Sequence, residues 1–266
     1  MPELPDIASY LVALRPRVVL QRLERIHVRS PFLVRTVEPD LFSLAGETVL
    51  DLSRIGKRIV WHFGDERFVV FHLMIAGRFH WKAPGTKPRG KNDLASFEFA
   101  SGTLMLTEAS QKKRASLHVV RGAAALAAFD RGGIEPVECS LAEFTSALMR
   151  ENHTLKRALA DPRLFSGIGN AYSDEILFDA KLSPVILTSR LTDKQITELY
   201  DAAQTVLRRW TDRLSAEAAE RFPEKVTAFR SGMAVHGRFG KPCPRCGTAI
   251  QRIVYAENES NYCPRC

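Results

Sequence analysis

The chain has 266 residues, 45% of them hydrophobic, so it is large and apolar enough for two folded domains and is not intrinsically disordered. No run of 18 or more apolar residues could cross a bilayer, and no signal peptide is apparent, so we expect a soluble, intracellular protein. The formal net charge of +8 favours an anionic partner such as nucleic acid.

The chain begins Met1-Pro2-Glu3-Leu4-Pro5. Methionine is often removed before a small residue, which would leave Pro2 with a free secondary amine, a nucleophile towards aldehydes. An α-amino pKa of roughly 7.7 to 8.0 leaves a useful neutral fraction at physiological pH. Glu3 is a candidate proton donor or acceptor beside this amine. The same residues also fit an ordinary helix start, so the motif alone leaves both readings open.

The N-terminal part of the chain is predicted to be a β-sandwich or barrel-like domain over residues 1–122, led by one helix. Ile7, Leu11 and Leu14 have helical spacing, and we expect Pro16 to end that helix. Short runs of β-branched and aromatic residues follow, separated by glycine-containing turns. The strands are predicted at Arg58–Phe63, Arg67–Leu73, Leu94–Phe99 and Thr103–Thr107.

The central part of the chain has helical periodicity and is predicted to form a domain over residues 132–234. Glycine and proline residues mark the breaks between its helices. The helices are predicted at Leu141–Glu151, Leu155–Ala160, Ala171–Ala180 and Thr192–Leu214.

One of these breaks is a glycine turn, Ser166-Gly-Ile-Gly-Asn170, that leads into a helix. Backbone N–H groups at a helix N-terminus favour a phosphate, and Asn170 can cap the helix or donate to such a ligand. Lys156 lies fourteen residues earlier. Tight connections and helix-hairpin-helix proteins contain the same pattern, so the turn alone does not identify a ligand.

Four of the five cysteines form two CxxC pairs near the C-terminus, whereas Cys139 stands apart. Two matched pairs suit a tetrahedral zinc ion held by four thiolates, while a redox dithiol would need only one pair. Four protein ligands leave no open coordination position, so the zinc is expected to be structural. The ion would stabilise a hairpin over residues 235–266. The ligands are Cys243, Cys246, Cys263 and Cys266.

Four motifs in this order resemble the formamidopyrimidine-DNA glycosylase / endonuclease VIII family over essentially the full chain. They are the N-terminal Met-Pro-Glu-Leu-Pro, the Arg54-Ile-Gly-Lys57 stretch, the Gly-Ile-Gly-Asn turn with its helix, and the paired CxxC. The resemblance implies an α+β protein with an N-terminal antiparallel β-sandwich, a helix-two-turn-helix domain and a zinc-finger hairpin. It also implies a bifunctional DNA glycosylase and AP lyase of base-excision repair.

In this resemblance, Pro2 corresponds to the nucleophile that attacks C1′ and forms a Schiff base, and Glu3 to the acid that helps open the sugar ring. Lys57 corresponds to the cation that holds a phosphate beside the reacting sugar. Lys156 and Asn170 match the family's phosphate contacts. The implied partner is double-stranded DNA containing oxidised bases or abasic sites. We expect a monomer with one zinc ion that acts at the nucleoid in the cytoplasm. No membrane partner is expected.

Three positions depart from the family pattern. Ile75 replaces a methionine that fills the gap left by the flipped base, and it is branched and stiffer. Arg114 corresponds to an arginine that probes the opposite base, but Ala115 replaces its aromatic neighbour, so weaker opposite-base discrimination is expected. Asn258 replaces an arginine that reaches a phosphate near the lesion from five residues before the third cysteine. An amide can still donate a hydrogen bond there but carries no charge, so about one counterion's worth of salt dependence is expected to be absent.

The preferred lesion stays open. Residues 215–233, where related enzymes recognise an oxidised purine, specify no pocket, so oxidised purines, oxidised pyrimidines and hydantoins are all candidates. The extent of elimination, β or β,δ, is equally open. A non-catalytic protein that binds damaged DNA or junctions is the alternative, but it predicts loss of Pro2, Glu3 or Lys57, and all three are present. A zinc-ribbon protein of transcription or translation would leave the N-terminus unexplained.

Overall fold

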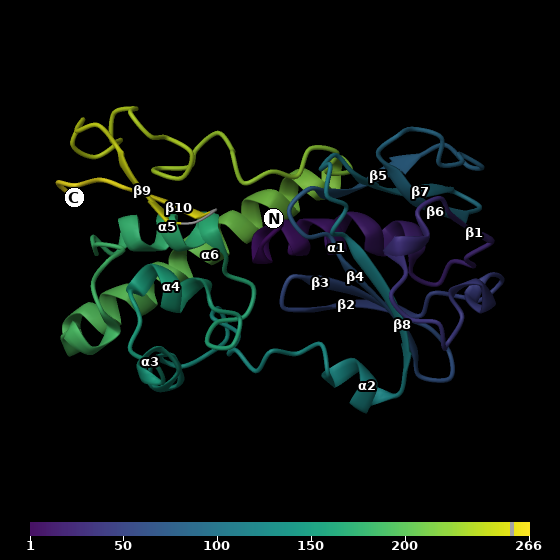
Figure 1. Ribbon diagram of the computed structural model, residues 1–266, viewed down its shortest axis with the longest axis horizontal. Coiled ribbons are helices and arrows are strands. Elements are labelled where there is room, and N and C mark those ends of the chain that lie inside the picture. The colour runs from purple at the N-terminus through teal and green to yellow at the C-terminus, as the bar shows by residue number, and fades with distance from the viewer. Residues whose placement is uncertain (256–257) are drawn as a thin grey trace. The chain divides into compact units, whose positions relative to one another are not determined.

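The computed structural model describes residues 1–255 and 258–266. They form two compact units, of which the first comprises Met1–Asp130 and Thr211–Val226 and the second Arg131–Trp210 and Thr227–Cys266. The predicted α+β fold, with a sandwich, a helical region and a C-terminal hairpin, is confirmed (Figure 1). Within the described residues, no helix is both long and apolar enough to cross a membrane.

The first unit contains two four-stranded antiparallel sheets, ordered β1-β6-β7-β5 and β2-β3-β4-β8. Four of the eight strands lie where short β-branched and aromatic runs predict them. The elements are α1 (Leu4–Val18), β1 (Arg25–Val28), η1 (Pro31–Leu33), η2 (Leu41–Leu44), β2 (Asp51–Ile55), β3 (Arg58–His62), β4 (Arg67–His72), β5 (Gly77–Lys82), β6 (Asp93–Phe99), β7 (Gly102–Glu108), β8 (Ser116–Arg121) and α2 (Ala123–Ala127).

Aromatic rings from both sheets form the centre of the sandwich core. The rings of Trp61 in β3 and Phe97 in β6 have centroids 5.4 Å apart. Phe71 in β4 and Phe79 in β5 are also 5.4 Å apart, in an edge-to-face arrangement. Such pairs add specific geometry to the burial of large apolar surfaces, so they fix how the two sheets pack.

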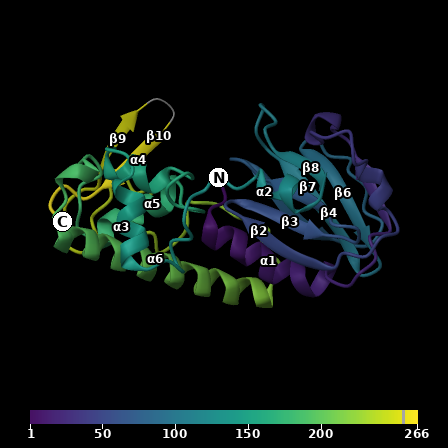
Figure 2. The same ribbon diagram turned by 90° about the horizontal axis from the view of Figure 1, so that it is seen from below.

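Helix α1 lies beside β2 and β3 and buries one face in the same core (Figure 2). The predicted end of this helix at Pro16 is wrong, because the helix continues to Val18. A proline lacks the N–H that would bond the carbonyl four residues earlier, so Pro16 costs this helix one hydrogen bond. Burial of Leu14 and Val18 offsets it, since both side chains are fully buried.

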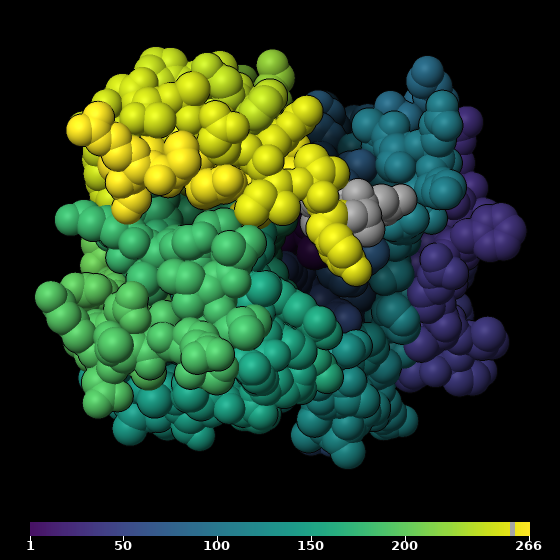
Figure 3. Space-filling view, turned by 60° about the vertical axis from the view of Figure 1, so that its left-hand side comes forward, coloured from purple at the N-terminus to yellow at the C-terminus, as the bar shows by residue number. Residues whose placement is uncertain are grey.

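The second unit is helical and ends in a two-stranded hairpin, whose strands β9 and β10 pair antiparallel. The segment from residue 227 onward, yellow in Figure 3, lies over the helices of this unit, and β10 contacts α5. The elements are α3 (Leu141–Met149), α4 (Leu155–Ala160), α5 (Asn170–Asp179), η3 (Thr188–Arg190), α6 (Asp193–Glu220), β9 (Gln251–Tyr255) and β10 (Asn258–Tyr262).

Helix α6 is six residues longer at its C-terminus than the predicted Thr192–Leu214. Its last part, with the residues that follow, belongs to the first unit. There Ala218, Phe222 and Val226 join the sandwich core, and the Phe222 ring lies 6.2 Å from that of Tyr10. Burial of this apolar surface explains why the helix continues past Leu214.

Candidate functional site

The N-terminus leads directly into α1. Glu3 is the N-cap of this helix, and its backbone N–H donates to the Asp6 carboxylate at 2.9 Å. Pro5 lies in the first helical turn, where a missing N–H costs nothing. Pro2 and Glu3 are both buried. The residues therefore do begin a helix, and that helix also holds Pro2 and Glu3 in fixed positions.

The terminal amine, which is carried here by Met1, has a pKa below its ordinary value of 8.0. Burial is the largest cause, and the nearby cations Arg78 and Lys57 lower the pKa further, while Glu3 raises it. Desolvation and positive neighbours both disfavour the protonated amine. The first unit thus brings Glu3 and Lys57 close to the terminal amine and favours the neutral, nucleophilic form of that amine.

Lys57 lies in the tight turn between β2 and β3, next to Gly56 with a φ of +57°. In the adjacent ladder Arg58 pairs with His72. Burial lowers the pKa of His72 to about 4, with further lowering by Arg58 and Lys57, so this imidazole is neutral near pH 7. The sequence analysis predicts neither His72 nor Arg78 as a site residue, although both lie within three residues of Ile75.

Ile75 lies in the turn that joins β4 and β5, and its side chain is 55% exposed. The turn is closed by a 2.8 Å hydrogen bond from the Gly77 N–H to the Leu73 carbonyl. A Cβ at Gly77 would come within 2.2 Å of that carbonyl oxygen, so only glycine fits there. Arg78 donates to the Ile75 carbonyl at 3.1 Å. These contacts hold an apolar side chain outward from a fixed turn.

Arg114 is exposed in the loop between β7 and β8. The buried Glu108 carboxylate organises this loop, because it accepts the N–H groups of Arg114 at 2.9 Å and Ala115 at 3.1 Å. Ala115 is only 3% exposed and belongs to the sandwich core. Its side chain points away from solvent, so this position cannot carry a probing group.

The glycine turn and Lys156 meet in the second unit. Asn170 is the first residue of α5, and Gly169 is its N-cap. The Lys156 Nζ donates to the Asn170 carbonyl at 2.5 Å and to the Asp174 carboxylate at 2.6 Å. The lysine is therefore joined to the start of α5 by two hydrogen bonds, and its charge is paired with Asp174.

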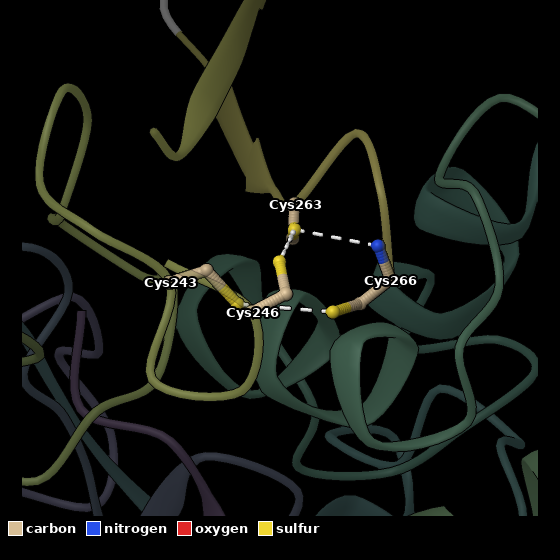
Figure 4. Close-up of side chains that lie close together, drawn as sticks. All are labelled: Cys243, Cys246, Cys263 and Cys266. Carbon is tan, nitrogen blue, oxygen red and sulfur yellow. Dashed lines mark hydrogen bonds between the residues drawn. The ribbon is translucent and has the colours of Figure 1, made fainter. Parts of the chain in front are cut away.

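The four predicted zinc ligands converge, with their sulfur atoms all within 4.8 Å of one another (Figure 4). Cys243 and Cys266 Sγ are 3.8 Å apart, and Cys246 and Cys263 Sγ are 3.5 Å apart. Four thiolates at about 2.3 Å from one tetrahedral ion would be separated by about 3.8 Å, so the arrangement fits zinc. Without a metal ion the four thiols share protons: hydrogen bonds from Thr248 lower the pKa of Cys246 to about 6, and hydrogen bonding to Cys246 raises the pKa of Cys266 to about 12.

Backbone contacts and a cation support this zinc site. The Cys266 N–H donates to Cys263 Sγ at 3.4 Å, so the last residue of the chain is tied to its partner ligand. Arg245, inside the first CxxC, donates to the Phe178 carbonyl at 2.7 Å and pairs with Asp179 at 3.3 Å. Arg245 thus anchors the zinc module to the C-terminal end of α5.

Asn258 begins β10 and pairs with Tyr255 in the hairpin. Its side chain lies outside the described part of the structure, as do residues 256 and 257. Tyr255 is 84% exposed. The hairpin therefore presents an aromatic side chain across from the position where the family pattern has an arginine.

Comparisons with known proteins cover the whole chain. The model of the formamidopyrimidine-DNA glycosylase N-terminal domain matches residues 1–115, that of the H2TH domain of the same enzyme matches 133–216, and that of the zinc finger found in FPG and IleRS matches 240–266. Two similar relatives are the formamidopyrimidine-DNA glycosylases of Solibacter usitatus, 32% identical, and Heliobacterium modesticaldum, 30% identical. Each alignment covers 100% of this chain and 99% of the relative.

Solved structures show the same similarity. The Lactococcus lactis Fpg in complex with DNA containing an abasic site is 28% identical with a TM-score of 0.87, over 99% of this chain and 98% of that one. MutM in complex with DNA containing carbocyclic 8-oxo-G is 27% identical with a TM-score of 0.87, over 100% and 99%.

Proposed function

The chain belongs to the formamidopyrimidine-DNA glycosylase family, and from that membership we propose that Pro2 carries both a base-removing and a strand-cleaving activity. It is a DNA glycosylase of base-excision repair, and its partner is double-stranded DNA containing oxidised bases or abasic sites. The AP-lyase step and the roles of individual residues are the proposed part. Action at the nucleoid in the cytoplasm is also proposed, because the substrate is DNA.

After removal of Met1, the secondary amine of Pro2 attacks C1′ of the damaged nucleotide, and the C1′–N bond to the base breaks. Loss of the sugar ring oxygen from C1′, with a proton delivered to that oxygen, gives an iminium on the opened sugar. Glu3 is the proposed proton donor. The surroundings of the N-terminus carry this proposal: burial and the cations Arg78 and Lys57 lower the pKa of the amine on Met1, and the same groups would surround the Pro2 amine, which must be unprotonated to attack.

The iminium withdraws electrons and acidifies the C2′ proton. Removal of that proton pushes electrons towards C3′, so the C3′–O bond breaks and the 3′ phosphate leaves. Water then hydrolyses the imine and frees the amine. Glycosylase and lyase steps thus share one nitrogen atom, which is why we assign both to Pro2.

Lys57 is proposed to hold a phosphate beside the reacting sugar. Its positive charge lowers the pKa of the terminal amine and that of His72, so Lys57 lies near enough to the nucleophile to affect it electrostatically. A cation near a leaving phosphate stabilises the developing negative charge. Arg78 acts on the same amine and is proposed as a second cation of this site.

The remaining DNA contacts are proposed from the loops and the second unit. Ile75 would fill the gap left by the flipped base, since its side chain is exposed on a fixed turn. Arg114 would approach the opposite strand, and Asn170 would donate to a phosphate at the start of α5. The one zinc ion is structural, because its four thiolate ligands leave no position for substrate.

Borohydride trapping on a duplex with an abasic site tests the proposal. The protein with a free Pro2 should form a covalent adduct with the sugar, and Pro2→Gly or an N-terminally blocked form should lose most of it. A panel of oxidised purines, oxidised pyrimidines and hydantoins would then identify the lesion. Failure of the free N-terminus to form an adduct would remove the lyase step and favour a non-catalytic damaged-DNA-binding protein.

A further inference from the structure

The carboxylate of Asp174, on α5, is fully buried and accepts hydrogen bonds from three separate segments of the second unit. Lys156 Nζ lies at 2.6 Å, His236 Nδ1 at 2.8 Å and Ser260 Oγ at 2.9 Å. The backbone N–H of Asn261 adds a fourth hydrogen bond at 3.1 Å. A buried carboxylate is costly unless its oxygens are paired, so this degree of pairing explains how the charge is tolerated.

The segments joined by Asp174 are the proposed DNA-binding parts of this unit. Through Lys156, Asp174 reaches the Asn170 carbonyl at the start of α5. Through Ser260 and Asn261 it reaches β10, the strand that begins with Asn258. One side chain therefore connects the glycine turn with the zinc hairpin.

His236 extends the network to the segment before the zinc module. The ring of Phe229 stacks on the His236 ring with centroids 5.6 Å apart and an interplanar angle of 18°. The neighbouring Glu175 carboxylate accepts the N–H groups of Ala234 at 2.8 Å and of Val235 and His236 at 2.9 Å. Two adjacent acids of α5 thus fix the chain over residues 234–236, and His236 in turn stacks on Phe229.

The state of Lys156 differs from that of a phosphate ligand. Two of its three N–H donors are used by Asn170 and Asp174, its charge is matched by the Asp174 carboxylate, and its side chain is only 15% exposed. A lysine that binds a phosphate directly releases counterions, and its loss lowers the salt dependence of binding. Replacing a lysine that is already paired inside the protein should lower the affinity for DNA but should have little effect on the slope of log affinity against log salt concentration.

We propose that Asp174 is a positioning residue for DNA binding, which locks the start of α5 to β10, and that Lys156 acts through Asn170 instead of contacting a phosphate. The proposal rests on the proposed DNA-binding function but not on the base-removal and strand-cleavage steps assigned to Pro2. Asn170 and the N–H groups of the turn remain the donors, and the Lys156–Asp174 pair keeps them in place relative to the hairpin.

Binding to a duplex with a tetrahydrofuran abasic analogue tests this inference, because that analogue does not need the Pro2 amine. Dissociation constants would be measured between 50 and 200 mM salt, a range over which roughly 10³-fold or larger losses are typical for many phosphate contacts. The variants are Lys156→Met, Asp174→Asn and their combination, all checked for zinc content. Lys194→Met, which removes an 83% exposed lysine of the same unit, is the matched control.

We expect each single variant to weaken binding by about tenfold, the combination to add little, and the salt slope to stay as in the control. Rates at saturating abasic DNA should be unchanged, since the nucleophile lies in the other unit. A slope lowered by about 0.9 in Lys156→Met, or fully additive effects, would overturn the inference. If Asp174→Asn loses zinc, the slope of Lys156→Met alone decides. Failed trapping with intact binding would refute only the lyase step.

Discussion

The guanidinium of Arg245 lies 4.2 Å from the ring centroid of Phe178 and donates to the carbonyl oxygen of the same residue at 2.7 Å. One side chain of the first CxxC thus satisfies a carbonyl at the C-terminal end of α5, where a cation is favourable. The arginine at the equivalent position of the second CxxC, Arg265, is exposed. The two CxxC motifs therefore have the same sequence, but the arginine of the first contacts α5 and the arginine of the second is exposed.

Replacing Arg245 should loosen the zinc module. Arg245→Ala removes a cation–π contact and a charge-assisted hydrogen bond, so we expect unfolding in urea to cost about 1–2 kcal/mol less, after allowance for partial exposure. Arg265→Ala is the matched control and should change stability by less than about 0.5 kcal/mol. Equal effects of both substitutions would contradict the role of the α5 contact.

Removal of zinc should unfold the hairpin and spare the sandwich. The hairpin core is small and is built around Cys243, Cys263, Val235 and Ile250, so it depends on the metal. Chelation should abolish tight binding to abasic-analogue DNA while the main thermal transition of the sandwich persists, and added zinc should restore binding. Undiminished binding by the zinc-free protein would show that the hairpin is not needed.

Schiff-base formation should depend on pH through the terminal amine. The amine on Met1 has a pKa below 8.0, and we expect the same burial and cations to lower the pKa of the Pro2 amine. The trapping rate at saturating DNA should therefore already reach its plateau near pH 8 and fall as the amine becomes protonated at lower pH. Arg78→Met removes a cation that disfavours protonation, so its rising limb should move to higher pH. A limb that stays in place would show that Arg78 does not act on the nucleophile.

An aromatic side chain at position 115 should not create an opposite-base probe. Ala115→Phe would overpack a buried site and destabilise the protein by about 1–3 kcal/mol. Ala109→Phe, in the same loop at an exposed position, is the control and should leave stability nearly unchanged. In the parent protein, cleavage rates should differ little between the four opposite bases. In Ala115→Phe these differences should not increase. A marked spread in either protein would argue against this loop assignment.

Local sequence patterns predict the helices of this protein better than its strands. Leu155–Ala160 begins and ends as predicted, because apolar spacing and the following Pro162 act locally. Strands β1, β2, β5 and β8 were not predicted. Strand β1, for example, has four residues and is defined by pairing with β6, about seventy residues later, which no local pattern reveals.

Local sequence patterns also predict only part of the candidate site. Pro2, Glu3 and the four cysteines can be predicted because their chemistry depends on chain position or spacing. Arg78 lies in β5, more than seventy residues from the N-terminus, so its effect on the terminal amine depends on the fold and nothing local indicates it. Asp174 resembles an ordinary helix surface acid in the sequence, and only the fold reveals its five donors.

Helix α6 supplies its first part to the second unit and its last turns to the first. A proteolytic fragment that ended at Asp130 would therefore lack Ala218, Phe222 and Val226 and would expose part of the sandwich interior. No uninterrupted stretch of the chain therefore contains the first unit without also containing the helices of the second.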